Sequence, residues 1–400
     1  MHLTHLSLTN FRSFARLDMD VPRRVLLLVG DNAQGKTTLL EAIYYLAAFT
    51  SLHASTDRQL INFLAGQESL AVGRVVGEFE RGGQRHRIEA RLIQEATAAN
   101  GPRLRKEVLV DGVKRSVHEA LRLFNAVIFL PQMTSIVEGG PEERRRYLNL
   151  ALSQTVPGYA QALTEYSQIL SQRNALLKQL AERRGDISQL HYWDELLSKR
   201  GAVLISNRIE AVQELEREAT RYHYRLTHGQ EVLRMVYHPA YDPLPKPAGQ
   251  FSLPLDTDVD RSKFTREQIQ QGFQRRLELL RPEEIARGVT TIGPHRDEVR
   301  FLANGVALGD FGSRGQVRTT LLALKLAELH WMKTRTGEWP VLLLDETLAE
   351  LDAQRRKDLL EILTQSEQSV LTTTDLTQFP EAFVRESTVW QVQTGVVARA

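Results

Sequence analysis

The 400-residue chain contains no cysteine and no run of 18 apolar residues. The first absence excludes disulfide bonds and metal sites built from thiolates. The second argues against a membrane-spanning helix, and the N-terminal stretch MHLTHLSLTNFRSF lacks the apolar segment of an export signal. We therefore expect a cytoplasmic protein without a membrane partner.

The chain also has little net charge, because 51 basic and 49 acidic residues leave only +2 at pH 7. This balance argues neither for nor against nucleic acid, since binding depends on how charges cluster. Apolar residues make up 42% of the chain, which is enough for a sizeable core. The length indicates two or three domains, or one large domain with an insertion.

A phosphate-loop motif is the strongest feature that the chain does contain. An apolar run of strand length, Val25 to Val29, precedes residues 30–37, which read GDNAQGKT and fit the pattern G-x-x-x-x-G-K-[ST] in full. Apolar residues with helical spacing follow. A chance match in a chain of this length has a probability on the order of one per cent, and the flanking strand and helix lower it further.

The residue types of this loop suit a bound triphosphate. Gly30 and Gly35 let the backbone turn and bring its N–H groups to phosphate oxygens, and the following helix adds its own free N–H donors. Lys36 would place its ammonium beside the β- and γ-phosphates, and Thr37 would offer a hydroxyl to Mg²⁺. The other candidate nucleotide-binding residues of the segment are Asp31, Asn32, Ala33, Gln34 and Thr38.

Arg12 stands between Phe11 and Phe14, shortly before the phosphate-loop strand. It is either a surface arginine in a turn or a guanidinium that reaches phosphate, and the sequence leaves both interpretations open.

A second apolar strand, residues 341–344, delivers two adjacent carboxylates, Asp345 and Glu346. A carboxylate beside a phosphate loop can hold Mg²⁺, directly or through water, and the next one can polarise an attacking water. The ordinary alternative is a strand that ends in a solvated acidic turn. The presence of Lys36 and Thr37 in the same chain favours the site.

Residues 313–316, Ser-Arg-Gly-Gln, open a strongly apolar helix that runs to about Met332. A helix start with Ser313 and Gly315 can bind an anion, although such starts are common as plain caps. Helical spacing also predicts an antiparallel helical hairpin from Pro141 to about Arg225 and a helix over 263–280, with an exposed loop at 238–258 between them.

Two β-hairpins are predicted within about 70–117, one turning at Gly82-Gly83 and one at Asp111-Gly112. Both are rich in basic residues, which are Arg81, Arg85, Arg87, Arg91, Arg103, Arg105, Lys106, Lys114 and Arg115. Most such charge runs are solvated strand faces, but two in succession are a modest indication of a track for the DNA backbone.

These motifs in this order resemble the ABC-type ATPase head of the SMC superfamily, and the finer details resemble the bacterial RecF family. The matching stretches are residues 8–12, 30–38, 140–141, 144–146, 172–174, 193–194, 293–297, 313–316 and 372–375. The resemblance implies an α/β fold, an ABC/SMC-type head of mixed sheets and helices with an inserted, mostly α-helical lobe. The ATPase lobe would comprise residues 1–134 and 288–400, and the inserted lobe 135–287.

The resemblance also implies the function. It indicates a weak ATPase of recombinational repair that uses ATP and Mg²⁺, forms an ATP-dependent homodimer on double-stranded DNA at gaps or stalled forks, and works with a RecR-like mediator. By the family pattern, Lys36 and Thr37 would bind the phosphates and Mg²⁺, Asp345 would support the metal, and Glu346 would orient the hydrolytic water. Gln132 would sense metal and water, Arg12 would join the nucleotide site, Ser313, Gly315 and Gln316 would meet the partner's nucleotide, and Asp352 would cross the dimer seam. The resemblance assigns no chemical task to His295 or Arg296, for which a structural role and a contact with DNA or nucleotide are equally open.

Three alternatives explain less of the sequence. An ATPase subunit of an ABC transporter needs a surface for a membrane partner and usually a histidine after the last core strand, and neither is visible. A structural SMC-type tether needs hundreds of heptad residues, and the inserted region is far too short for them. A nucleoside kinase would account for the phosphate loop but not for Ser313 to Gln316 followed by Asp345-Glu346.

Overall fold

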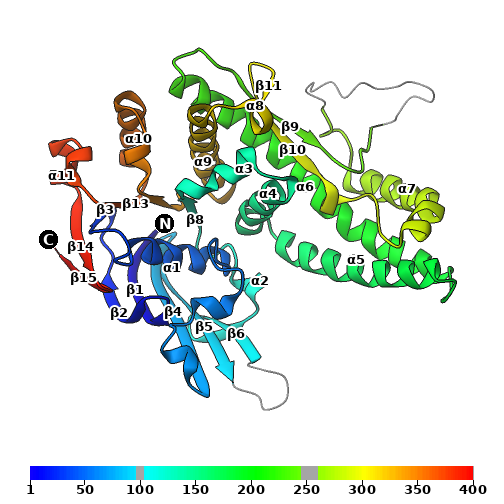
Figure 1. The fold of residues 1–400 in the computed structure, drawn as a ribbon, viewed down its shortest axis with the longest axis horizontal. Coiled ribbons are helices and arrows are strands. Elements are labelled where there is room, and N and C mark those ends of the chain that lie inside the picture. Colours follow the sequence, from blue (N-terminus) through cyan, green and yellow to red (C-terminus); the bar gives the residue numbers. More distant parts are fainter. Residues whose placement is uncertain (96–102, 245–259, 400) are drawn as a thin grey trace. The chain divides into compact units, whose positions relative to one another are not determined.

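The computed structural model describes residues 1–95, 103–244 and 260–399 (Figure 1). These residues form two compact units, one of residues 1–133 with 328–400 and one of residues 134–327. The division falls within helix α9, Arg314–Thr336. The resemblance predicts residues 288–327 as part of the ATPase lobe, whereas the structure groups them with the second unit. The reason is that strand β10, Glu298–Ala303, pairs along its length with β9, Leu233–His238.

Two six-stranded sheets form among the described residues of the first unit, with strand orders β2-β1-β4-β5-β6-β7 and β15-β14-β3-β13-β12-β8. The strands of the first sheet are β1 (His2–Phe11), β2 (Phe14–Asp20), β4 (Leu70–Arg81), β5 (Gln84–Glu95), β6 (Arg103–Val110) and β7 (Val113–Arg115). Those of the second are β3 (Arg24–Val29), β8 (Ala126–Phe129), β12 (Val341–Asp345), β13 (Gln368–Thr373), β14 (Thr388–Gln393) and β15 (Val396–Arg399).

The first sheet is antiparallel and is built from tight hairpins. Asp111 and Gly112 both have positive φ, 50° and 80°, as a type I′ turn requires, and Gly82 and Gly83 turn in the same way. Both hairpins predicted from the sequence are thereby confirmed. A third two-residue turn, at Arg12, joins β1 to β2.

The second sheet is parallel apart from its edge strand β15. Its central strands β3 and β12 are largely apolar and buried, as strands covered on both faces must be. Strand β13 is also buried, although it carries Gln, Ser and Thr side chains. Helix α1, Lys36–Ala48, packs against strands of both sheets, and apolar residues all around it are buried. Because parallel strands end at one edge, the loops after β3, β12 and β13 come together there.

The remaining helices of the first unit are short or cover the second sheet. They are α2 (Val117–Ala120), α10 (Ala353–Gln365) and α11 (Glu381–Glu386), with single 3₁₀ turns at Asp57–Leu60, Ala65–Gln67, Pro131–Thr134, Thr347–Glu350 and Leu376–Gln378.

The second unit is mainly helical, and α5, Tyr159–Ala181, and α6, Gln189–Leu226, form the predicted antiparallel hairpin (Figure 1). Helix α7, Arg266–Arg287, packs against both. The unit also contains α3 (Ser135–Glu138), α4 (Pro141–Thr155), a 3₁₀ turn at Pro294–Arg296, α8 (Leu308–Phe311) and a sheet of order β11-β10-β9, with β11 at Val306–Ala307. Of the loop predicted at 238–258, residues 245–258 lie outside the described part of the chain.

An ionic cluster with no exposed side chain holds the three long helices together. Arg173 of α5 donates to Asp194 of α6 and lies 2.7 Å from Glu284 of α7. Its third contact is the hydroxyl of Thr290, at 2.7 Å. Arg173, Asp194, Glu284 and Thr290 are all 0% exposed, so each charge depends on its partner for solvation.

The Gly-Pro-His-Arg-Asp segment, residues 293–297, belongs to a second buried network. Asp297 accepts hydrogen bonds from Arg208 at 2.7 Å, from Tyr237 at 2.5 Å and from a backbone N–H. His295 bonds the hydroxyl of Tyr166 at 2.8 Å, and burial lowers the pKa of His295 to about 4. The aspartate and the histidine of this motif are thus tied into the packing of the second unit.

No helix within the described ranges is both long enough and apolar enough to cross a membrane.

Candidate nucleotide site

Two glycines of the phosphate loop are required by the local geometry. A Cβ atom on Gly30 would lie 2.2 Å from the carbonyl oxygen of Val392 in β14, so the loop passes too close to that strand for a side chain. Gly35 has a φ of +106°, and a Cβ there would also press against the Phe14 ring at 3.1 Å. The predicted loop between β3 and α1 is confirmed, with Gly35 as the N-cap of α1.

The side chain of Lys36 is buried and folds back over its own loop. Its ammonium donates to the carbonyl oxygens of Gly30 and Asp31, at 2.5 and 3.0 Å. The same nitrogen lies 3.3 Å from a carboxylate oxygen of Glu346, which follows β12. The structure therefore brings the positive charge of the loop and the second of the two predicted carboxylates together.

Asp345 is the centre of a small hydrogen-bond network at the ends of three elements. Thr37, at the start of α1, donates to one carboxylate oxygen at 2.8 Å, and Thr372 of β13 donates to the other at 2.6 Å. The Thr372 hydroxyl also accepts from the backbone N–H of Glu346 at 3.0 Å. Thr37 and Asp345 are 308 residues apart in the sequence, and the parallel register of β12 and β13 places Asp345 beside Thr372.

Glu346 has a left-handed backbone, with a φ of 45°, which is uncommon for a residue with a side chain. Strain of this kind is often found where a side chain is held in position for function. The Glu346 side chain is 39% exposed, in contrast to the buried Asp345. The pair thus offers one fixed and one solvent-accessible carboxylate.

The residues present fit a magnesium ion that is held mainly by substrate and water. Among the described residues there is no group of three or more His, Asp or Glu side chains that could hold a metal. Mg²⁺ usually takes one or two protein oxygens, with phosphates and waters completing its octahedron. The hydroxyl of Thr37 and the carboxylate of Asp345 provide oxygens of this kind at 2.8 Å from each other.

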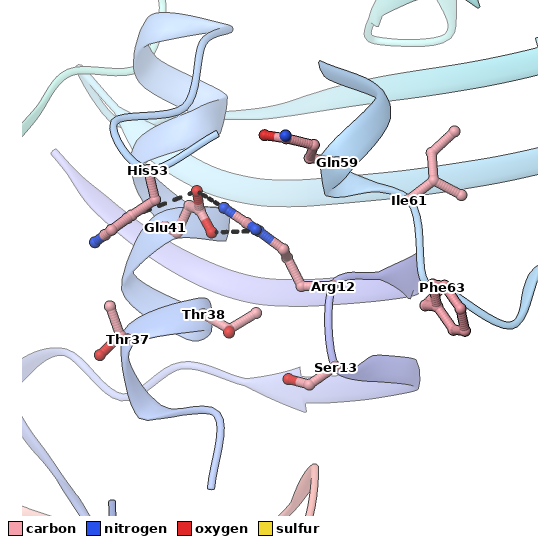
Figure 2. A pocket seen from close by; sticks show the side chains of 9 residues that line it. All are labelled: Arg12, Ser13, Thr37, Thr38, Glu41, His53, Gln59, Ile61 and Phe63. Carbon is pink, nitrogen blue, oxygen red and sulfur yellow. Dashed lines mark hydrogen bonds and ion pairs between the residues drawn. The ribbon is translucent and has the colours of Figure 1, made fainter. Parts of the chain in front are cut away.

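A pocket of about 480 Å³ opens beside the first turn of α1 (Figure 2). It is lined by Arg12, Ser13, Thr37, Thr38, Glu41, His53, Gln59, Ile61 and Phe63. Figure 2 shows polar side chains gathered near α1 and the apolar Ile61 and Phe63 on the other side. Phe63 is 77% exposed, so the pocket has an aromatic surface that is not covered by the first unit.

Arg12 is held in this pocket by Glu41 of α1. Its Nε and Nη2 donate to the two carboxylate oxygens at 2.9 and 2.8 Å, in a bidentate pair. The backbone supports this placement, because the N–H of Arg12 bonds Leu60 and its carbonyl accepts from Asn62 at 2.7 Å. The guanidinium is therefore held in a fixed plane in a pocket that Thr37 and Thr38 also line, and a contact of Arg12 with phosphate stays a prediction.

Glu41 is 5% exposed and ionised. Burial opposes its ionisation, but hydrogen bonds from His53, Arg12 and Ser51 outweigh that cost and lower its pKa to about 2. The side chain of Gln132 reaches the other ring nitrogen of His53. The structure thus brings Gln132 to the edge of this pocket, and its predicted metal-sensing role stays a prediction.

Sequence reasoning missed Glu41, His53 and Phe63. Glu41 lies within a helical run where an acidic residue is ordinary, and His53 and Phe63 lie in irregular segments without a motif. Tertiary contacts identify them: Arg12 pairs with Glu41, His53 lies beside Glu41, and Phe63 lines the same pocket.

The other predicted site residues lie at helix starts. Asp352 is exposed and caps α10 by accepting from the N–H of Arg355 at 2.9 Å. In the second unit, Ser313 accepts from the N–H of Gln316 at 3.2 Å at the start of α9. Neither arrangement tests the predicted contact with a partner's nucleotide.

Many of the basic residues on the hairpins are paired with acids. Buried Glu89 binds Arg74 and Arg91, at 2.8 and 2.6 Å, and these hydrogen bonds lower its pKa to about 2. Further pairs are Arg87–Glu78, Arg85–Glu80, Arg105–Glu107 and Lys114–Glu107. Pairing of this kind weakens the case for a DNA track here.

Comparison with known proteins places the chain in a family. The family model for the RecF/RecN/SMC N-terminal domain matches residues 2–397. Over 99% of both chains, the sequence is 37% identical to the DNA replication and repair protein RecF of Roseiflexus castenholzii. The chain belongs to the RecF family. The sequence is also 37% identical to the DNA replication and repair protein RecF of Chloroflexus aggregans, again over 99% of both chains.

Solved structures of RecF show the same fold as this RecF-family chain. The structure of the recombination mediator protein RecF-ATPrS in the RecFOR pathway has a TM-score of 0.82 and 30% identity, and covers 100% of this chain and 98% of the other. That of RecF-ATP in the same pathway has a TM-score of 0.81 and 29% identity, over 100% and 97%. The predicted SMC/ABC-type α/β fold is confirmed, and family membership decides against the transporter and kinase interpretations.

Proposed function

We propose that this RecF-family protein is an ATP-dependent DNA-binding protein of recombinational repair. ATP would drive its dimerisation on duplex DNA at gaps or stalled forks, where it helps a RecR-like mediator to load the recombinase. The observation that carries the proposal is the meeting of Thr37 with Asp345 at 2.8 Å, beside Lys36 and Glu346. Membership of a family of DNA replication and repair proteins supports the biological setting.

The triphosphate would be bound by the loop and by the N-terminus of α1. Lys36 already lies among oxygens of its own loop, and a phosphate would take the place of these weaker acceptors. Arg12, fixed by Glu41, would face the same nucleotide, with Phe63 as a surface for the apolar face of the base. Magnesium, when bound between Thr37 and Asp345, would neutralise phosphate charge.

Hydrolysis would depend on Glu346 as the group that orients and deprotonates the attacking water. Its side chain is accessible, close to the Lys36 ammonium, and held by a left-handed backbone. One chain holds the nucleotide on its own loop, whereas the γ-phosphate would be enclosed by Ser313 and Gly315 of a second copy. Preorganised donors at the site of developing charge are usually the largest catalytic contribution, so a lone chain should hydrolyse ATP weakly.

The conformation of Gly315 supports an approach from outside the chain. Glycine within a helix costs about 1 kcal/mol relative to alanine, so it needs a reason. Gly315 has neither the positive φ of Gly35 nor the close backbone neighbour of Gly30, since a Cβ there would meet nothing among the described residues closer than the Ser313 hydroxyl at 3.9 Å. A close contact with another molecule would explain why this position carries no side chain.

The proposal predicts nucleotide-dependent binding to DNA. Duplex DNA titrated into the protein by fluorescence anisotropy should bind at least tenfold more tightly with ATP than with ADP, because only the closed dimer joins two DNA-binding surfaces. The affinity should fall as salt is raised, since phosphate contacts release counterions. Equal affinity with ATP, ADP and no nucleotide would contradict ATP-driven assembly on DNA.

A further inference from the structure

Gln316, the last residue of the Ser-Arg-Gly-Gln motif, makes hydrogen bonds with both polar ends of its side chain within the second unit. Its side-chain carbonyl accepts from the backbone N–H of Ser313 at 2.9 Å, while its own backbone N–H donates to the Ser313 hydroxyl at 3.2 Å. This reciprocal pair is a capping box, in which residues three apart satisfy each other's free donors at a helix start. The Ser313 hydroxyl is thus held by the backbone of Gln316, and the Ser313 backbone by the Gln316 side chain.

The other end of the Gln316 amide is held by Glu231. Its Nε2 donates to a carboxylate oxygen of Glu231 at 2.8 Å. A carboxylate only accepts hydrogen bonds, so this contact requires the NH₂ group of Gln316 on the side of Glu231. The carbonyl oxygen then has to face Ser313, where it receives the backbone N–H. Glu231 thus determines which way the amide points, and with it the geometry of the cap.

The backbone of Glu231 is held by hydrogen bonds that do not involve Gln316. It lies in the turn between α6 and β9, where its N–H and its carbonyl both contact the Thr227 hydroxyl, at 3.3 and 3.4 Å. Asn304 bonds the flanking residues of the same turn. The second carboxylate oxygen lies 3.6 Å from the fully buried His223 of α6. The turn is thus a rigid support for the start of α9.

We propose that Glu231 and Gln316 are positioning residues that present Ser313 and Gly315 to the nucleotide of a second copy of this chain. Both polar ends of the Gln316 side chain are used within the unit, so Gln316 acts through Ser313 rather than on the nucleotide. Glu231, 82 residues earlier than Ser313, lies outside every motif of the sequence. This inference rests on the proposed two-chain site, in which a preset hydroxyl and N–H group stabilise the γ-phosphate without reorganisation.

The test uses the full-length protein and compares Glu231→Ala, Glu231→Gln and the control Glu216→Ala. ATP-dependent dimerisation is measured by sedimentation, hydrolysis by phosphate release, and ATP affinity of the monomer by titration below the dimerisation range. Glu231→Ala should weaken dimerisation and slow hydrolysis by about 10- to 100-fold, as expected for a hydrogen bond to a charged group, with unchanged ATP affinity of the monomer. Glu231→Gln should behave nearly like the parent, because an amide oxygen still accepts.

Glu216→Ala is the matched control for general loss of stability. Glu216 lies on α6 and bonds Arg234 and the N–H of Met235, so its removal also costs a partly buried carboxylate contact in the same unit. It does not bond Gln316. If the loss of any such carboxylate contact weakened dimerisation, Glu216→Ala and Glu231→Ala would both dimerise more weakly. If Glu231 acts by positioning Gln316, only Glu231→Ala should do so.

A charge swap makes the test independent of how well Glu231→Ala folds. In Glu231→Lys a donor would face the NH₂ group of Gln316, which should flip the amide and break the cap, giving a larger loss than alanine. Adding Gln316→Glu supplies an acceptor for both the lysine and the Ser313 N–H, and should restore dimerisation to within about threefold of the parent. Normal assembly of Glu231→Ala, or a swap that restores nothing, would overturn this inference. Failure of the parent protein to dimerise with ATP would instead overturn the proposed function.

Discussion

Glu346→Gln should reduce ATP hydrolysis by about 10²- to 10⁴-fold, the contribution typical of a general base, and leave ATP binding intact. Gln keeps the size of the side chain but cannot accept a proton from water. Lys36 lies 3.3 Å from Glu346, so removing the negative charge of Glu346 should strengthen the interaction of Lys36 with phosphate. The variant should therefore accumulate as an ATP-bound dimer that persists for many turnovers of the parent.

Single-turnover phosphate release and sedimentation with ATP measure the two parts of this expectation. Glu338→Gln is a suitable control, since Glu338 is a glutamate of the same unit that pairs with the N-terminal ammonium, outside the nucleotide site. If Glu346→Gln hydrolysed ATP at the parental rate, Glu346 would not be the general base. A strictly monomeric Glu346→Gln protein with saturating ATP would count against assembly on two nucleotides.

The second large effect concerns stability, and it follows from the buried pair of Arg208 and Asp297. Arg208→Met should lower the free energy of unfolding of the second unit by about 3–5 kcal/mol, because it leaves a carboxylate that is 1% exposed without its cation. Arg208 also donates to Asn149 at 3.0 Å and to the carbonyl of Pro294. Its loss therefore loosens contacts among α4, α6 and the 294–296 turn together.

Denaturant unfolding monitored by hydrogen exchange of the second unit measures this loss. The double variant Arg208→Met/Asp297→Asn removes the orphaned charge and should be less destabilised than the sum of the two single variants. The same measurement on Arg300→Met, an exposed arginine of β10, controls for loss of a positive charge. A change below about 1 kcal/mol in Arg208→Met would show that this network does not hold the unit together.

The sequence was sufficient for the elements whose own pattern is strong. The apolar strands at 25–29 and 341–344 and the hairpin turns at Gly82-Gly83 and Asp111-Gly112 are where the patterns predicted them. Strands β9, β14 and β15 were not predicted. Strand β9, LRMVYH, is too short to show a clear period, and β14 is mostly half-buried. Their pairing with β10 and β3 becomes apparent only in the folded chain.

The candidate site was predictable where it is local and not where it depends on packing. The phosphate loop and Asp345-Glu346 are contiguous motifs, and the parallel sheet brings them to one edge. Glu41 and His53 enter the site only because the β1–β2 turn carries Arg12 to them. The resemblance predicts residues 288–327 as part of the ATPase lobe, whereas the pairing of β10 with β9, which the sequence does not reveal, groups them with the helical unit.

The central claim is that Thr37 and Asp345 serve one metal-bound triphosphate, and Mg²⁺-dependent ATP binding tests it most directly. Calorimetry of ATP binding with Mg²⁺ and with a chelator is compared for the parent, Thr37→Ala, Asp345→Asn and the double variant. We predict that Mg²⁺ strengthens ATP binding to the parent, that either single variant removes most of this gain, and that the double variant loses no more. A gain from Mg²⁺ that survives in both single variants, or losses that add fully in the double variant, would contradict a shared ion.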